Sequence, residues 1–130
     1  MINPMVDESN TTPSTSAPVA LTLDIQSLSR SCNEVLILST LSSGPHHGYQ
    51  LALEIEDRSG GAFRFKHGTL YPILHKLEND KLIQGDWLEE EGRRKRKRYQ
   101  LTAAGRQRLS QQVVEWSEFF ERFFNVVMET

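Results

Sequence analysis

Apolar residues recur at helical spacing once the chain passes residue 25. In residues 26–43 they follow one another at three- and four-residue steps, which predicts a helix whose apolar stripe is Leu28, Cys32, Val35, Leu38 and Leu41. Gly44 and Pro45 come next, and a glycine at C′ followed by a proline is a strong helix stop. The first predicted helix therefore ends just before residue 44.

Two further helices are predicted after this stop. Residues 48–58 place Leu51 and Ile55 one turn apart, and the sequence "SGGAF" then interrupts the pattern. A third helix is expected to begin near His67 or Gly68, with its apolar stripe at Leu70, Ile73, Leu74 and Leu77. Pro72 lies inside it, where proline is unfavourable beyond the first turn.

The apolar period changes from helical to alternating after Asp80. Ile83 and Trp87 share one face of a predicted strand, and Tyr99 and Leu101 share one face of another. The turn-like sequence "EEEG" lies between them, so residues 82–101 are predicted to form a β-hairpin with a charged tip. Thr102 is a natural N-cap for a long final helix over residues 103–128.

These elements give a mainly α fold with a small β-hairpin, arranged as a winged helix-turn-helix whose wing is the hairpin. A length of 130 residues suits one domain. Residues 1–24 are rich in Pro, Ser and Thr, which predicts a flexible tail. We expect a winged helix-turn-helix DNA-binding domain over residues 25–102 and a dimerisation helix over residues 103–128.

Localisation signals are not evident, and the expected compartment is the cytoplasm. No basic segment followed by an apolar run suggests a signal peptide, and no run of about eighteen apolar residues could span a membrane. The single cysteine, Cys32, excludes an intramolecular disulfide and fits a reducing environment.

Charge is distributed unevenly along a chain whose formal net charge is only −2. Residues 93–108 contain eight basic residues and no acidic one. Six of these are consecutive and form the predicted wing contacts with DNA: Arg93, Arg94, Lys95, Arg96, Lys97 and Arg98. Strand alternation sends Arg94, Arg96 and Arg98 to one face and the other three to the face of Tyr99 and Leu101.

The basic run has alternative interpretations. An isolated charge run is usually a solvated surface, and the hexamer alone also fits a nuclear-localisation signal. Within a helix-turn-helix frame, however, a basic wing is suited to the phosphate backbone or the minor groove, so we favour contact with double-stranded DNA.

Three segments of the chain resemble the PadR family of transcriptional regulators. They are "GPHHGYQL" (44–51), "HGTLYPILHKLENDKLI" (67–83) and "RKRYQLTAAG" (96–105), and with their spacing they cover about 60 residues. The single long helix after the wing is similar to the branch of that family with a short C-terminus. The resemblance implies a winged helix-turn-helix repressor that binds DNA.

The chain departs from the family pattern at several positions. Lys81 replaces a glycine that usually ends the recognition helix with a positive φ, and a lysine there should cost about 1 kcal/mol. The family often has two tyrosines before its Leu-Thr pair, and Arg98 occupies the position of the first one. The family commonly caps its recognition helix with Ser, whereas this chain has Lys66 and His67 there. These departures do not change the expected fold. They affect only how closely the family's detailed DNA contacts can be transferred to this chain.

The predicted recognition helix has a polar arc opposite its leucines. A helix in the major groove uses its N-terminal residues on base edges, so the predicted DNA contacts are Lys66, Thr69, Tyr71, Pro72, His75 and Lys76. The resemblance also assigns Tyr71 to DNA contact, although half-buried packing against the preceding helix is the alternative. Tyr49 is expected to pack into the core, and His46 and His47 are expected to be loop residues.

The final helix carries a narrow apolar and aromatic stripe. Its roughly 37 Å length exceeds what the winged domain can cover, so we expect a symmetric homodimer. The predicted dimer interface combines one residue of the first helix with this stripe: Leu28, Leu109, Val113, Trp116, Phe120, Phe123, Phe124 and Val127. Some relatives bind flat hydrophobic compounds at a corresponding tryptophan, which makes Trp116 a candidate effector site, with dimer core as the alternative.

The pattern as a whole predicts a sequence-specific DNA-binding regulator. We expect a repressor that acts as a homodimer on a palindromic operator, with a small aromatic or hydrophobic effector as a further candidate partner. The competing class is a winged-helix protein-interaction module without sequence-specific DNA binding. No nucleophile motif or phosphate loop suggests an enzyme, the four histidines show no ligand spacing with Cys32 or carboxylates, and no cofactor is expected.

Overall fold

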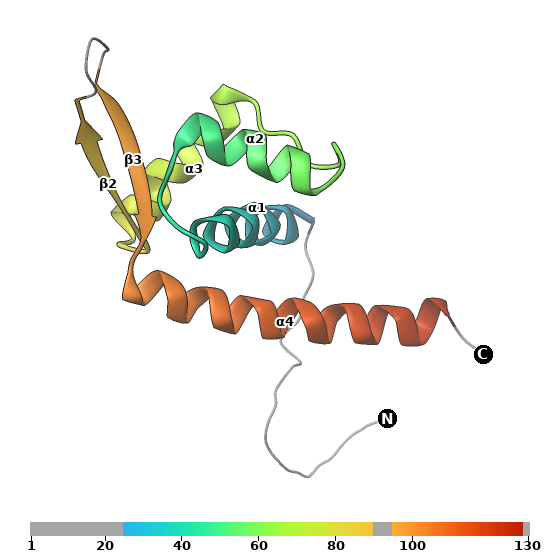
Figure 1. The fold of residues 1–130 in the computed structure, drawn as a ribbon. Helices are drawn as coiled ribbons and strands as arrows, with labels where there is room; N and C mark the ends of the chain where they lie inside the picture. The colour runs from blue at the N-terminus through green and yellow to red at the C-terminus, as the bar shows by residue number, and fades with distance from the viewer. Residues whose placement is uncertain (1–24, 90–94, 129–130) are drawn as a thin grey trace.

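The protein contains four helices and a three-stranded sheet within the part that the structure, a computed structural model, describes (Figure 1). The described residues are 25–89 and 95–128, so the predicted tail over residues 1–24 lies outside them. In chain order the elements are α1 (Ile25–Leu41), β1 (His46–His47), α2 (Gly48–Arg58), α3 (His67–Asn79), β2 (Ile83–Leu88), β3 (Arg96–Leu101) and α4 (Ala103–Val127).

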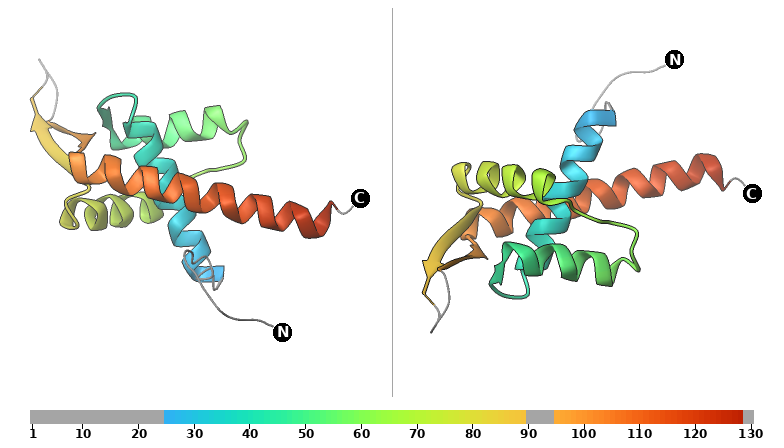
Figure 2. Two further views of the ribbon diagram at one scale, coloured as in Figure 1. Left: turned by 90° about the horizontal axis from the view of Figure 1, so that it is seen from below. Right: turned by 90° about the horizontal axis from the view of Figure 1, so that it is seen from above.

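Helix α1 lies at the centre of the molecule. Helices α2 and α3 lie on one side of it and α4 crosses it on the other, while the sheet stands at one end (Figures 1 and 2). The C-terminal half of α4 extends past the rest of the fold (Figure 2). This arrangement confirms the mainly α winged helix-turn-helix predicted from the pattern.

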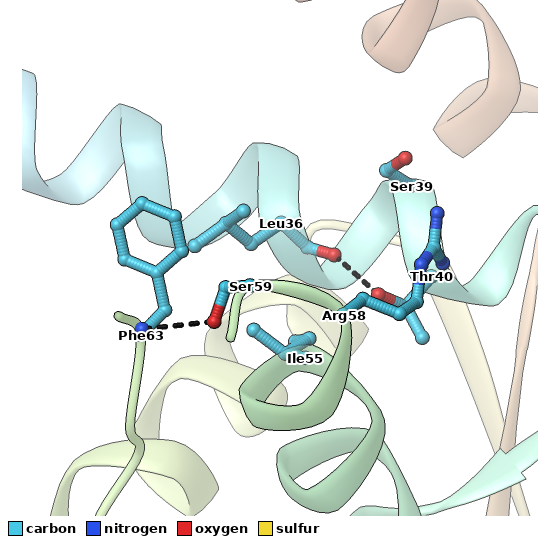
Figure 3. A pocket seen from close by; sticks show the side chains of 7 residues that line it. All are labelled: Leu36, Ser39, Thr40, Ile55, Arg58, Ser59 and Phe63. Carbon is cyan, nitrogen blue, oxygen red and sulfur yellow. Dashed lines mark hydrogen bonds between the residues drawn. The ribbon is translucent and has the colours of Figure 1, made fainter. Parts of the chain in front are cut away.

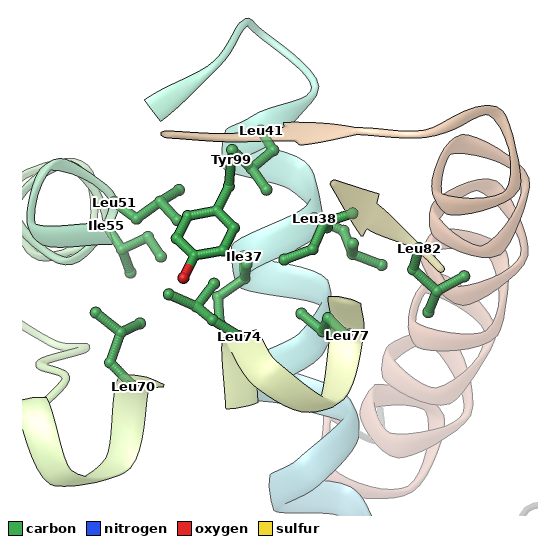
Figure 4. Packing of buried hydrophobic residues seen from close by; sticks show 11 residues of the cluster. Ile37, Leu38, Leu41, Leu51, Ile55, Leu70, Leu74, Leu77, Leu82 and Tyr99 are labelled. Atoms are coloured by element: carbon green, nitrogen blue, oxygen red, sulfur yellow. The ribbon is translucent and has the colours of Figure 1, made fainter. Parts of the chain in front are cut away.

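The core fills the space between α1, α2, α3 and the sheet (Figure 4). Its fully buried side chains are aliphatic except for one tyrosine, and they include Ile37, Leu38, Leu41, Leu51, Leu70, Leu74, Leu77, Ile83 and Tyr99. The predicted stripes of α2 and α3 are confirmed. Ile37 of α1 is also fully buried, although the predicted stripe did not include it. Helix α1 is covered on more than one side, so it buries a wider arc than a single stripe.

The sheet has three strands in the order β1–β3–β2, so the expectation of a two-stranded hairpin was incomplete. The prediction that His46 and His47 are loop residues was wrong. They pair antiparallel with β3, His46 opposite Tyr99 and His47 opposite Arg98. A two-residue strand has too few positions to show an alternating pattern, so only the tertiary pairing reveals it.

Helix α3 continues through Pro72, which costs it one backbone hydrogen bond to the carbonyl of Gly68. The predicted helix start at His67 is confirmed, and Pro72 itself is exposed. After the helix, Lys81 has a φ of 62°, which confirms that the chain takes a left-handed turn at the position where the family uses glycine.

Helix α4 is joined to the end of α3 by hydrogen bonds around Thr102. The predicted N-cap is confirmed, since the Gly105 N–H donates to Thr102 Oγ1 at 3.0 Å. The same hydroxyl lies 2.8 Å from the Lys81 carbonyl oxygen, and the Thr102 N–H donates to the Leu82 carbonyl at 3.1 Å. Gly105 packs so closely on this turn that a Cβ there would overlap the Leu82 carbonyl oxygen.

We predict opposite effects for one substitution at two helical glycines. Gly105→Ala should lower the free energy of unfolding by about 3 kcal/mol, because the Leu82 backbone cannot move aside. Gly68→Ala, in α3, should raise it by up to about 1 kcal/mol, because the added methyl group meets no other side chain or neighbouring element within 4 Å. Urea unfolding followed by circular dichroism measures both. A Gly105→Ala variant as stable as the unaltered chain would contradict the proposed close contact.

Candidate nucleic-acid interface

Helix α3 presents a polar surface to solvent on the side away from the core. Of the predicted DNA contacts in this region, five side chains are exposed: Lys66, Thr69, Pro72, His75 and Lys76. Lys76 forms an ion pair with Asp80 one turn later, with Nζ 3.0 Å from the carboxylate oxygen. A helix with its N-terminal turn uncovered and its leucines buried has the geometry needed to enter a major groove.

Tyr71 is half-buried and packs on the first residue of α2. A Cβ on Gly48 would lie 2.9 Å from the Tyr71 ring, so the absence of a side chain at Gly48 makes room for it. The packing alternative for Tyr71 is therefore observed. The DNA contact predicted for the same residue stays a prediction, since part of its surface remains accessible.

Tyr49 does not pack into the core, and the expectation that it would was wrong. It is 52% exposed and touches the His67 ring edge-on, with centroids 6.2 Å apart. His67 in turn meets Tyr71 edge-on at 5.9 Å. The first turn of α2 points Tyr49 outward because Gly48 and Leu51 occupy its buried face. These three rings lie across the beginnings of α2 and α3.

The basic residues of the wing divide into exposed and half-buried side chains. Lys95 and Arg98 are exposed, whereas Arg96 and Lys97 are partly covered. Arg93 and Arg94, and most of the turn predicted between the strands, lie outside the described residues. Asp86 stands opposite Arg98 in the β2–β3 pairing, which places a carboxylate beside one of the exposed cations.

Lys97 is held between the wing and the recognition helix by Glu78. Its Nζ lies 2.8 Å from Glu78 Oε1, and the Gly85 N–H donates to Glu78 Oε2 at 3.3 Å. Both carboxylate oxygens of one α3 residue thus bind the two strands of the wing. Lys97 lies directly over Gly85, where any side chain would collide with it.

Tyr99 is buried beside this ion pair and remains protonated. Its burial, together with the charge of Glu78 and the neighbouring Tyr71, raises the pKa of Tyr99 to about 12. The Lys97 ammonium lies 5.4 Å from the centre of the Tyr99 ring and 5.6 Å from that of Trp87. The phenol therefore contributes a neutral aromatic surface to the base of the wing at any physiological pH.

A cleft of about 260 Å³ separates the recognition helix from the wing. It is lined by aromatic and basic side chains and one glycine: His47, Gly48, Tyr49, Tyr71, His75, Trp87, Arg96, Lys97 and Tyr99. Sequence reasoning identified the basic strand and the recognition helix but missed Glu78 and Trp87. Glu78 lies inside the segment 67–83 that resembles the PadR family, but the sequence alone does not show which residue its carboxylate binds.

A polar seam joins α4 to α1 on the other side of the molecule. Glu34 Oε1 accepts from Arg108 at 3.3 Å and from Gln112, and Trp116 Nε1 donates to Ser31 Oγ at 3.1 Å. Trp116 also contacts the rings of Phe119 and Phe120. These contacts favour packing over ligand binding for Trp116, and the effector site stays a prediction.

The predicted dimer stripe on α4 is largely uncovered. Leu28, Leu109 and Trp116 are partly buried, whereas between 45% and 57% of the residue surface is accessible at Val113, Phe120, Phe123, Phe124 and Val127. The exposed phenylalanines follow Trp116, on the half of α4 that extends past α1 (Figure 1).

Another hollow, also of about 260 Å³, lies between α1 and the end of α2 (Figure 3). Leu36, Ile55 and Phe63 form its apolar wall, and Arg58 lies at its edge (Figure 3). Within residues 25–89 and 95–128, no group of three or more His, Cys, Asp or Glu side chains could hold a metal ion. No helix in those ranges is both long and apolar enough to cross a membrane.

Sequence comparison connects residues 37–111 to the transcriptional regulator PadR-like family, whose model matches them. The chain is 37% identical over 75 residues to the transcriptional regulator Rv3488 of Mycobacterium tuberculosis. The matched region covers 58% of this chain and 66% of that protein. It is 33% identical over 86 residues to an uncharacterized protein of Lysinibacillus sphaericus, covering 66% of this chain and 79% of that one.

Solved structures show the same architecture. A PadR-like transcription factor from Bacteroides fragilis superposes with a TM-score of 0.68 and 26% identity, covering 78% of this chain and 95% of that one. Bacillus subtilis PadR, solved in complex with operator DNA, superposes with a TM-score of 0.60 and 26% identity, covering 64% of this chain and 46% of that one. The family match spans more than half of the chain and contains both α3 and the wing, and the protein therefore belongs to the PadR-like family of transcriptional regulators.

Proposed function

We propose that this protein is a transcriptional repressor that binds a palindromic operator as a homodimer, with α3 in the major groove and the wing on the neighbouring backbone. The observation that carries the proposal is the connection of the two contact elements through Glu78, which holds an exposed polar helix beside a basic strand. The DNA complex of Bacillus subtilis PadR, a relative with the same fold, supports it.

Electrostatics supports duplex DNA as the partner. Four of the exposed basic side chains lie in the wing, in α3 or at its N-cap, namely Lys66, Lys76, Lys95 and Arg98, although Lys76 and Arg98 each have a carboxylate nearby. Cations on one surface release counterions from the phosphate backbone, which gives salt-sensitive affinity. The exposed residues of the first turn of α3 would then read base edges.

The exposed part of α4 supports a homodimer. Phe120 and Phe124 stack one turn apart, and Phe119 and Phe123 do the same on the adjacent face. An apolar surface of this kind is unfavourable in water and is typical of an interface. A second copy of the same helix offers a matching surface, and twofold symmetry would place two recognition helices on two half-sites.

The competing proposal is a protein-interaction module whose basic wing docks on an acidic partner. The two differ in their DNA preference. A regulator binds a site selected from its genome far more tightly than random duplex, whereas a basic interaction module binds both weakly and equally. A genome-wide map of bound sites, followed by polarisation titrations on one bound and one scrambled duplex, separates them.

The wing should contribute affinity without sequence preference. Changing Arg94, Arg96 and Arg98 together to Ala should weaken binding to every duplex similarly and reduce the salt slope by about one for each phosphate that is no longer neutralised. Polarisation titrations across a series of salt concentrations measure both. Arg58→Ala, at the end of α2 that lies away from the wing (Figure 1), is the control and should change neither. An unaltered slope in the triple variant would exclude the wing from binding.

The first turn of α3 should contribute specificity. Thr69→Ala should reduce the ratio of affinities for a selected site and its scrambled version by about tenfold, since one base-edge contact is worth about 1–3 kcal/mol. Competition binding with the two duplexes measures this ratio. Asn79→Ala removes an exposed side chain at the other end of the same helix and should leave the ratio unchanged. Equal effects of the two substitutions would argue against base reading by this turn.

The aromatic surface of α4 should set the oligomeric state. The unaltered chain should sediment as a dimer at micromolar concentration, and Phe120→Asp with Phe124→Asp should give a folded monomer, because buried unpaired charges oppose association. Analytical ultracentrifugation measures the mass, and circular dichroism shows whether the helices persist. A stable monomer of the unaltered chain at this concentration would contradict the homodimer.

A further inference from the structure

Trp87 is an exposed aromatic side chain that does not belong to the hydrophobic core. It is 64% accessible, although it lies on the same face of β2 as the buried Ile83. Gly85 stands between them in the strand, and β2 and β3 extend past the neighbouring helices (Figure 1). Large aromatic surfaces left in water are unfavourable, so an indole at this place suggests a partner.

The Trp87 ring has one cationic neighbour, Lys97. Lys97, its direct neighbour in the β2–β3 pairing, points its ammonium at the ring from 5.6 Å while bonded to Glu78 of the recognition helix. A cation over a ring is attracted to the π face, and here the cation is itself fixed by an ion pair. Trp87 is therefore linked to α3 through Lys97 and Glu78.

The cleft beside Trp87 is lined by aromatic and basic side chains. It contains about 260 Å³ between α3 and the wing, and Trp87 and Tyr49, two of its walls, are more than half exposed. His75 reaches it from α3, Arg96 from the wing and His47 from β1, and none of the nine residues that line it is acidic. A nucleic acid strand has matching chemistry, because apolar deoxyribose rings alternate along it with anionic phosphates.

We propose that Trp87 packs against a deoxyribose of the DNA strand that passes between α3 and the wing. This inference rests on the proposed function and adds a contact that positions the duplex. The indole covers the sugar, while the basic side chains of the cleft face the adjacent phosphates. Because sugars are the same at every base pair, the contact is independent of sequence, and it fixes how deeply α3 enters the groove.

The test uses the full chain and a mixed-sequence duplex of about 30 base pairs at low salt, since sugar contacts need no operator. Trp87→Ala should weaken binding by about tenfold, the size expected when an aromatic contact with nucleic acid is removed, and Trp87→Phe should weaken it less. Neither should change the salt slope, because no charge is removed. This separates Trp87 from the wing arginines, whose removal lowers the slope.

Fluorescence gives a second readout. Subtracting the emission of the Trp87→Phe variant from that of the unaltered chain isolates Trp87, whose emission should be quenched and shifted to shorter wavelength as duplex is added. Phe63→Ala removes another exposed ring, one that does not line this cleft, and should leave affinity unchanged. Thermal unfolding of all three variants verifies that each is folded.

The outcomes are distinguishable. Unchanged affinity of Trp87→Ala, or unchanged Trp87 emission in a chain that binds the duplex, overturns this inference and leaves the proposed function intact. A reduced salt slope in Trp87→Ala also overturns it, because the substitution would then act through displaced cations. An unaltered chain that binds no duplex at low salt overturns both proposals.

Discussion

One carboxylate bonds the recognition helix to both strands of the wing, beside the core that packs them together. Glu78, near the end of α3, binds the Lys97 ammonium on β3 with one oxygen and the Gly85 N–H on β2 with the other. The ion pair is partly covered, with 20% of the Lys97 side chain and 29% of the Glu78 side chain accessible, so water screens it less than a surface pair. The two elements proposed to contact DNA are thus bonded directly to each other.

A second set of contacts connects this surface to the long helix. β3 ends at Leu101, and Thr102 immediately caps α4 while binding the carbonyl groups of Lys81 and Leu82 that follow α3. Gly105 lets the first turn of α4 lie directly on that turn. The direction of α4 is therefore coupled to the direction of α3. In the proposed dimer, this coupling would fix the distance between the two recognition helices.

The ion pair with Glu78 also distinguishes Lys97 from the other basic residues of the wing, which the sequence alone does not tell apart. All six basic residues of the wing were predicted as DNA contacts, yet Lys97 has an internal partner and lies beside the Trp87 ring, whereas Lys95 and Arg98 face solvent. Alternation along a strand assigned Lys97 to the face of Tyr99 but could not show that Glu78 lies beside it. A partner 19 residues away is found only once the strand and the helix are placed.

The sequence by itself determined the helices, the two wing strands and the Thr102 cap, because periodicity and capping are properties of neighbouring residues. The turn at Lys81 was expected only from the resemblance to the PadR family, since a lysine disfavours a positive φ. Only the tertiary structure decided that His46 and His47 form a third strand, that Tyr49 faces outward, and that Glu78 joins α3 to the wing. Each of these depends on which distant segment lies opposite. That choice is made by packing the whole core, and no local pattern of residues records it.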